Sequence, residues 1–146
     1  MARTGHAGFS LVELAIVLVV LGLVIAFSLP GVSRYNEDLA LRGATDQIAN
    51  AMQLTRTRAI STRTSRTMQF QAGYSETDYR VEVNGVFQSG WTLPKRISYA
   101  WLSGTISSVT MTPNGLCSTS GLIILQNTRG VRDTVSILSS GLVMSK

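Results

Sequence analysis

An apolar run near the start of the chain limits what the chain can fold into more than any other feature. Residues 9–29 are all apolar or small except for one carboxylate, that of Glu13. A helix of this length extends about 30 Å, the thickness of the hydrocarbon core of a bilayer. An acidic side chain at the centre of a spanning helix costs about 2.5–3.5 kcal/mol, so the carboxylate indicates a function and needs a partner.

Two simpler interpretations account for less of this run. A secretory signal peptide has a basic start, a shorter uncharged core and a small-residue cleavage site. Here the basic start is Arg3 alone, Glu13 interrupts the core, and no A-x-A-like site is evident at its end. A plain membrane anchor explains the length but leaves Glu13 and the preceding Gly8-Phe9 pair unexplained.

The residues around Glu13 resemble a type IV prepilin signal. A short polar leader, residues 1–8, ends in Gly8; Phe9 follows, and Glu13 is the fifth residue after the leader. The resemblance implies that a prepilin peptidase cuts between Gly8 and Phe9 on the cytoplasmic side and then N-methylates Phe9. It also implies a single-pass protein of the bacterial inner membrane with its head in the periplasm, whose helix later packs in the core of a pilus or pseudopilus with other pilin or pseudopilin subunits.

Cleavage after Gly8 would give Glu13 a partner. It creates a cationic α-amino group on Phe9, and a buried carboxylate is tolerated when it is paired with such a charge. Because Phe9 and Glu13 are four residues apart, they can pair within one helix. Alternatively, Glu13 pairs with the Phe9 amine of a neighbouring subunit and sets its axial register. The family resemblance favours the second arrangement, and the residues alone leave both open.

Composition excludes several classes of site. The chain of 146 residues has room for one small domain after the apolar run. Its formal charge of +5 falls to +4 without the leader, which is compatible with an anionic partner but does not argue strongly for one. The only histidine, His6, lies in the leader, so histidine-based acid–base catalysis and the commonest zinc sites are excluded from the processed chain. We therefore expect no enzyme activity, no metal and no cofactor.

Cys117 is the only cysteine, so an intramolecular disulfide is excluded. A lone cysteine in an exported protein is a free thiol or, less often, forms an intermolecular bridge. Free cysteine behaves as a small hydrophobic residue, and we therefore expect a buried structural thiol rather than a functional one.

The organisation of the chain follows from its periodicity. We expect a leader over residues 1–8, a hydrophobic helix over 9–30, an amphipathic helix over 31–62 and a β-rich head over 63–146. Gly22 lowers helix propensity and Pro30 removes a backbone donor, so a helix break is expected between them, and the pilin resemblance implies that this segment can unwind in a filament. The alternative is that Pro30 merely ends the membrane helix at Leu29.

The amphipathic segment carries one apolar stripe. Apolar or small residues recur at steps of three or four from Leu41 to Ala59, and this stripe should pack on a sheet. The opposite face carries polar residues, namely Arg42, Asp46, Gln53 and Arg56.

From Thr67 onward the pattern is that of short strands. Alternation and turn residues predict strands at Met68–Gln71, Tyr79–Val83, Val86–Gln88, Ile97–Leu102, Ser108–Thr112, Gly121–Gln126, Asp133–Leu138 and Leu142–Ser145. Asn84-Gly85 is a strong hairpin signal between the second and third of these. The sequence therefore predicts an α+β fold in which a long N-terminal helix packs on an antiparallel β-rich head of two small sheets.

The second half is similar to the C-terminal pattern of GspH/FimT-type minor pseudopilins. The pattern comprises an apolar strand, Pro113-Asn114-Gly115, Gly121 to Ile124, Arg129-Gly130, Val135 to Ile137 and Ser140 to Val143. Arg56 with Ala59-Ile60 resembles the same group. The resemblance covers most of the chain from Gly8 to Val143 and is weakest from Ala72 to Thr105.

Two groups of arginines suggest contact with DNA phosphates as an alternative function. Arg56, Arg58, Arg63 and Arg66 lie in a Ser/Thr-rich segment, which is a phosphate-binding patch or, as we favour, a solvated helix end. Arg129 and Arg132 lie in a late turn where some FimT-like proteins of DNA uptake carry a Gly-Arg-x-Arg motif. Here Val131 follows Gly130, so that motif is absent, and contact would rest on charge alone.

Three classes of function are therefore open at the level of sequence. The first is a structural minor pilin or pseudopilin of a type IV pilus or type II secretion pseudopilus. The second is a DNA-binding minor pilin that uses Arg129, Arg132, Arg63 and Arg66. The third, a membrane-anchored enzyme, has little support because no catalytic constellation is evident.

Overall fold

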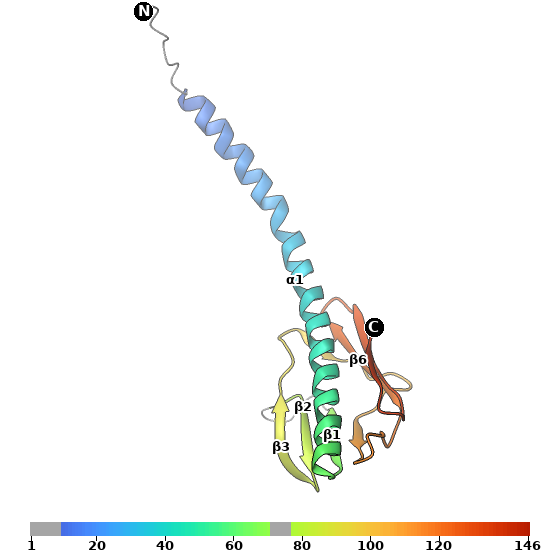
Figure 1. Cartoon of the computed structure of the whole chain (residues 1–146). Helices are drawn as coiled ribbons and strands as arrows, with labels where there is room; N and C mark the ends of the chain where they lie inside the picture. Colours follow the sequence, from blue (N-terminus) through green and yellow to red (C-terminus); the bar gives the residue numbers. More distant parts are fainter. Residues whose placement is uncertain (1–9, 71–76) are drawn as a thin grey trace, which may run out of the picture. The chain divides into compact units, whose positions relative to one another are not determined.

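The computed structural model describes residues 10–70 and 77–146, and it describes the side chains of these residues except 27–32. Within these residues, one helix precedes eight strands, and Figure 1 shows their arrangement along the chain. The elements are α1 (Leu11–Thr62), β1 (Arg66–Phe70), β2 (Tyr79–Val83), β3 (Val86–Trp91), β4 (Ile97–Tyr99), β5 (Ser108–Met111), β6 (Gly121–Asn127), β7 (Arg132–Ile137) and β8 (Val143–Ser145). The predicted α+β class is confirmed.

The chain divides into two units, residues 1–36 and residues 37–146. The second unit contains two four-stranded sheets, with strand orders β3-β2-β1-β5 and β4-β6-β7-β8. All pairings between these strands are antiparallel. The expected pair of small sheets is therefore present, and we call the second unit the head.

The predicted strands agree closely with the observed ones. β2 has the predicted bounds, while β3 continues to Trp91 and β4 ends early, at Tyr99. Asn84 and Gly85 form the predicted hairpin turn with φ of 52° and 78°. Two consecutive positive φ angles are what a two-residue turn of type I′ requires, and this turn matches the twist of the strands that it joins.

The core of the head lies between α1 and the inner faces of both sheets. The predicted stripe on α1 is buried at Leu41, Ala44, Ile48, Met52 and Ala59, and all five belong to one hydrophobic cluster with residues of both sheets. The sheets contribute alternate residues to this cluster, among them Met68, Phe70, Tyr79, Val81, Ile123, Leu125, Val135 and Ile137. This alternation is the pattern expected of strands with one face on a core.

The helix is continuous across the segment from Gly22 to Pro30, so the expected helix break is not present in the single chain. α1 includes both Gly22 and Pro30 and extends to Thr62, so the alternative in which Pro30 ends the helix is wrong. Unwinding between these residues within a filament remains a prediction. Within the described residues, no helix combines the length and the apolar character that crossing a membrane requires. The predicted span, residues 9–29, extends beyond the residues whose side chains are described.

Candidate assembly site and basic surfaces

The start of α1 places Glu13 in a helix cap. The Oγ atom of Ser10 accepts a hydrogen bond from the Val12 N–H at 3.3 Å, and the Ser10 N–H donates to Oε2 of Glu13 at 3.4 Å. This reciprocal pair is a capping box, in which a Ser and a Glu three residues apart satisfy two free N–H groups of the first turn. Glu13 therefore has a local partner in the single chain. Gly8 and Phe9, the predicted cleavage and methylation site, lie outside the described residues.

The first turns of α1 expose a continuous apolar surface. Every large apolar side chain from Leu11 to Ile25 has more than half of its surface exposed. Soluble monomers seldom expose apolar patches of this extent, and such patches mark membrane or protein contacts.

Arg129 belongs to an ion cluster at the start of the head, formed by Glu37, Asp38, Arg96 and Arg129. Glu37 binds both arginines, with Oε1 at 2.8 Å from Nη1 of Arg96 and Oε2 at 3.2 Å from Nε of Arg129. Arg129 also pairs with Asp38. The hydrogen bond that Arg129 donates to Asp38 raises the pKa of the Arg129 guanidinium, and its hydrogen bond to Glu37 acts in the same direction. The guanidinium predicted to contact DNA is therefore already paired with two carboxylates.

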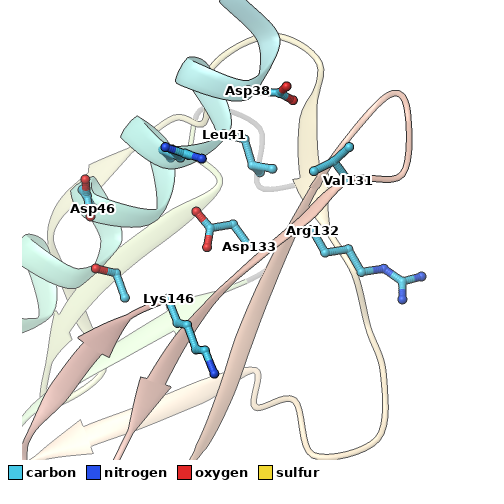
Figure 2. Close-up of a pocket in the computed structure, with 9 residues that line it drawn as sticks. Asp38, Leu41, Asp46, Val131, Arg132, Asp133 and Lys146 are labelled. Carbon is cyan, nitrogen blue, oxygen red and sulfur yellow. The ribbon is translucent and has the colours of Figure 1, made fainter. Parts of the chain in front are cut away.

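Arg132 lies beside a groove of about 510 Å³ between α1 and β7. Figure 2 shows the Asp133 side chain directed towards α1 and the Arg132 side chain directed away from it. Asp38, Asp46 and Asp133 line this groove together with three basic residues, so it has no dominant charge. No group of three or more His, Cys, Asp or Glu residues suited to a metal ion occurs in the described parts of the chain.

Arg63 and Arg66 lie at the other end of the helix. α1 runs from Glu37 to Thr62 within the head, which corresponds to about 38 Å at 1.5 Å per residue. Arg129 is bound to Glu37 at the start of this segment, whereas Arg63 directly follows Thr62 at its end. The four arginines proposed to contact DNA therefore do not form one surface. Whether either pair contacts DNA remains a prediction.

Arg56 has a role that its helical position does not indicate. It was expected in a solvated helix end, but its side chain is partly buried: its Nε donates to the Gly115 carbonyl at 2.8 Å and its Nη2 to the Ser140 carbonyl at 3.3 Å. The side chain thereby joins α1 to the turn after β5 and to the turn between β7 and β8. The Gly115 and Ser140 turns come from different sheets, so Arg56 ties both sheets to the helix.

Some of these contacts were readable from the sequence and others were not. The Ser10-x-x-Glu13 spacing is a known helix-start signature, and it would have predicted the cap. Glu37 and Arg129 are 92 residues apart, and Arg56 and Ser140 are 84 residues apart. No local pattern indicates such pairs.

Comparisons with known proteins found one match for the start of the chain and another for its fold. Residues 3–29 match the family model described as the prokaryotic N-terminal methylation motif. The fold matches crystal structures of the type IV minor pilin FimU of Pseudomonas aeruginosa strain PAO1. In space group P21 the TM-score is 0.59 at 17% identity, over 77% of this chain and 92% of FimU. In space group P65 the TM-score is 0.52 at 19% identity, over 73% and 92%.

The chain therefore carries a prokaryotic N-terminal methylation motif on a fold like that of a type IV minor pilin. The predicted resemblance to the type IV pilin-like superfamily is thereby confirmed, and the closer resemblance to GspH/FimT-type minor pseudopilins remains a prediction. No curated protein sequence matches the chain significantly. At these identities the likeness to FimU establishes the fold alone.

Proposed function

We propose that this pilin-like chain is a structural minor pilin or pseudopilin. In this proposal a prepilin peptidase removes residues 1–8 and methylates Phe9, and the processed chain assembles with other subunits into a type IV pilus or a type II secretion pseudopilus. The observation that carries the proposal is the match of residues 3–29 to the methylation motif, because this range contains Gly8, Phe9 and Glu13.

The exposed apolar surface of α1 supports the proposal. Large side chains from Leu11 to Ile25 lose contact with water when the helix enters an apolar environment, at about 25 cal/mol per Å² of apolar surface buried. A bilayer supplies that environment before assembly, with the head in the periplasm. A bundle of neighbouring helices supplies it in the filament.

Glu13 takes different partners in the two states of the proposal. In the single chain its carboxylate accepts a hydrogen bond from Ser10 at the start of α1. In the filament it pairs with the methylated Phe9 amine of a neighbouring subunit, which compensates the cost of burying the carboxylate among apolar helices. Because the pair forms at one axial offset only, it sets the register of the incoming subunit.

The mass of the mature N-terminal peptide tests the proposal directly. Filaments or membranes from cells that make the full chain should yield a peptide that begins with N-methylated Phe9. The matched control is the same chain in cells that lack the prepilin peptidase, where residues 1–8 should remain. An unprocessed chain in the presence of the peptidase, or cleavage at another bond, would contradict the proposal.

The DNA-binding alternative has weaker support from the geometry. Arg129 is engaged by Glu37 and Asp38, and it lies far from Arg63 and Arg66. A salt-dependent retardation of DNA by the full chain, abolished when Arg129 or Arg132 is replaced, would favour it.

A further inference from the structure

Three half-exposed apolar side chains gather where α1 ends. Ile60, Leu116 and Leu142 are 47%, 51% and 49% exposed. A Cβ added at Gly115 would lie 3.0 Å from Cδ1 of Ile60, so the Ile60 side chain rests on the turn that carries Leu116. Leu142 lines a small pocket of about 180 Å³ together with Arg56. We call Ile60, Leu116 and Leu142, with Arg63, the helix-end patch.

The backbone under the helix-end patch is held by several hydrogen bonds. Arg56 binds the carbonyls of Gly115 and Ser140. The Cys117 N–H donates to the Ser139 carbonyl at 3.0 Å, and the Leu138 N–H donates to the Leu142 carbonyl at 3.0 Å. These bonds join α1 and two turns into one support. A surface fixed in this way loses little conformational entropy when it binds a partner.

Arg63 gives the patch a positive edge and occupies an unusual backbone position. Its φ is 51°, its N–H donates to the Ile60 carbonyl, and the next N–H, that of Thr64, donates to the Ala59 carbonyl. This is the Schellman motif, in which the left-handed position is usually glycine. An arginine there costs backbone strain, and such strain is typical of functional positions.

The charge of this region has no internal compensation in the described residues. Arg58 and Arg63 are exposed, and neither forms an ion pair or side-chain hydrogen bond with a described carboxylate. By contrast, Arg80, Arg96 and Arg129 are paired with Glu82, Glu37 and Asp38. An apolar centre beside the exposed guanidinium of Arg63 is complementary to a surface with apolar side chains and a rim of carboxylates.

We propose that the helix-end patch docks a different, acidic protein subunit of the same filament. This inference rests on the proposed function as a filament subunit. Three aliphatic side chains do not contribute to phosphate binding, and the patch has no aromatic side chain on which a base stacks, so a protein fits better than a nucleic acid. A second copy fits less well, because Glu37, Asp38 and Glu82 are already paired with arginines, and Asp46 and Asp133 share their groove with three basic residues.

A photo-crosslinking amino acid at Leu116 of the full chain tests this proposal in cells that assemble the filament. The expected product is a cross-link to another filament subunit, at a site that mass spectrometry places beside Asp or Glu residues. The same amino acid at Phe87, which is 55% exposed on β3, is the matched control and should not capture that subunit. Cross-linking only to a second copy, to DNA or to nothing overturns the proposal.

Arg63→Gly separates binding from folding. It removes the guanidinium and relieves the strained backbone, so the head should remain folded and the cross-link should fall about tenfold. Arg132→Gly, which removes an exposed arginine elsewhere in the head, should leave the cross-link unchanged. Arg63→Glu should abolish the cross-link, and reversing the charge of the cross-linked carboxylate should restore it. An unchanged cross-link in Arg63→Gly overturns the proposal.

The mass of the N-terminal peptide, measured in the same preparations, separates the docking proposal from the proposed structural function. A chain that is cleaved, methylated and incorporated, yet gives no heterotypic cross-link, overturns the docking surface and leaves the structural function in place. A chain that is neither cleaved nor incorporated overturns the structural function itself.

Discussion

Gly141 faces Gly115 so closely that a Cβ added at Gly141 would overlap the Gly115 carbonyl oxygen. The same oxygen accepts the hydrogen bond from Nε of Arg56. The two glycines and the arginine therefore form one tightly packed junction between α1, the turn after β5 and the turn between β7 and β8.

Replacing Gly141 by Ala should destabilise the head strongly. The new methyl group would meet the Gly115 carbonyl oxygen, which is backbone, and the Arg56 guanidinium that binds it, and φ at this position is +80°. Strain and overpacking together should lower the free energy of unfolding by about 2–4 kcal/mol. Chemical denaturation of the full chain in detergent, followed by near-UV circular dichroism, measures this loss.

Gly130→Ala is the matched control for that substitution. Its φ of +78° is nearly the same, but a Cβ there has nothing within 4 Å. It should cost only the backbone strain, about 1 kcal/mol. Equal losses in the two variants would contradict the close packing at Gly141.

Glu37→Gln should loosen the start of the head. The variant loses the charge that Arg96 and Arg129 share, so hydrogen exchange of the α1 amides that follow Glu37 should accelerate. The acceleration should diminish as salt is added, because salt screens partly exposed ion pairs. Asp46 is an exposed carboxylate on the same helix, and Asp46→Asn should change neither the exchange rate nor its dependence on salt. Unchanged exchange in Glu37→Gln would show that the ion cluster does not hold the helix.

Tyr79→Phe should stabilise the protein. The ring is fully buried and stacks on Trp91 at a centroid distance of 5.3 Å. Its hydroxyl oxygen is buried with no hydrogen-bond partner among the described residues. Removing it while keeping the ring should raise the free energy of unfolding by about 1 kcal/mol. Tyr99→Phe is the contrasting variant, because its hydroxyl donates to the Asp78 carbonyl at 3.2 Å. It should be neutral or destabilising.

Cys117 should make the free energy of unfolding fall as the pH rises in the alkaline range. The buried thiol lies 3.1 Å from the Met111 sulfur, and burial raises its pKa, against a smaller opposite effect of Arg56. The folded chain therefore binds the proton more tightly, and stability should fall as the pH rises above the ordinary thiol pKa of about 8.5. Thermal unfolding of the wild type and of Cys117→Ala between pH 7 and 9.5 tests this. The decrease of the melting temperature with pH should be smaller in the variant. Equal slopes would assign the pH dependence to other groups.

The sequence predicted what depends on local periodicity and turn chemistry. The buried stripe from Leu41 to Ala59 and the Asn84-Gly85 hairpin follow from spacing and from residue type, and both are present. The partners of Arg56 and Glu37 could not be predicted, because periodicity tells which face of a helix is buried but not which turn lies opposite a given residue. Arg56, expected in a solvated helix end, binds two such turns instead.

Glu13 forms the capping box within one chain and, in our proposal, a charge pair between subunits, and three substitutions distinguish these roles. Gln retains a side-chain oxygen that accepts from the Ser10 N–H, so Glu13→Gln keeps the capping box but removes the charge. Glu13→Val removes both. Ser10→Ala removes the acceptor for the Val12 N–H and keeps the charge, at a cost of about 1 kcal/mol in helix stability.

If Glu13 pairs with the Phe9 amine of a neighbouring subunit, the charge decides assembly. Glu13→Gln and Glu13→Val should then be inserted and cleaved normally but incorporated into filaments poorly, and to the same extent, whereas Ser10→Ala should assemble. If the cap is what matters, Glu13→Gln should assemble like the wild type, and Ser10→Ala should share the defect of Glu13→Val. Immunoblots of sheared filaments against membrane fractions, normalised to mature chain, measure incorporation. The outcome for the Gln variant therefore decides whether the lone carboxylate of the apolar run acts by its charge between subunits or by its hydrogen bond within one.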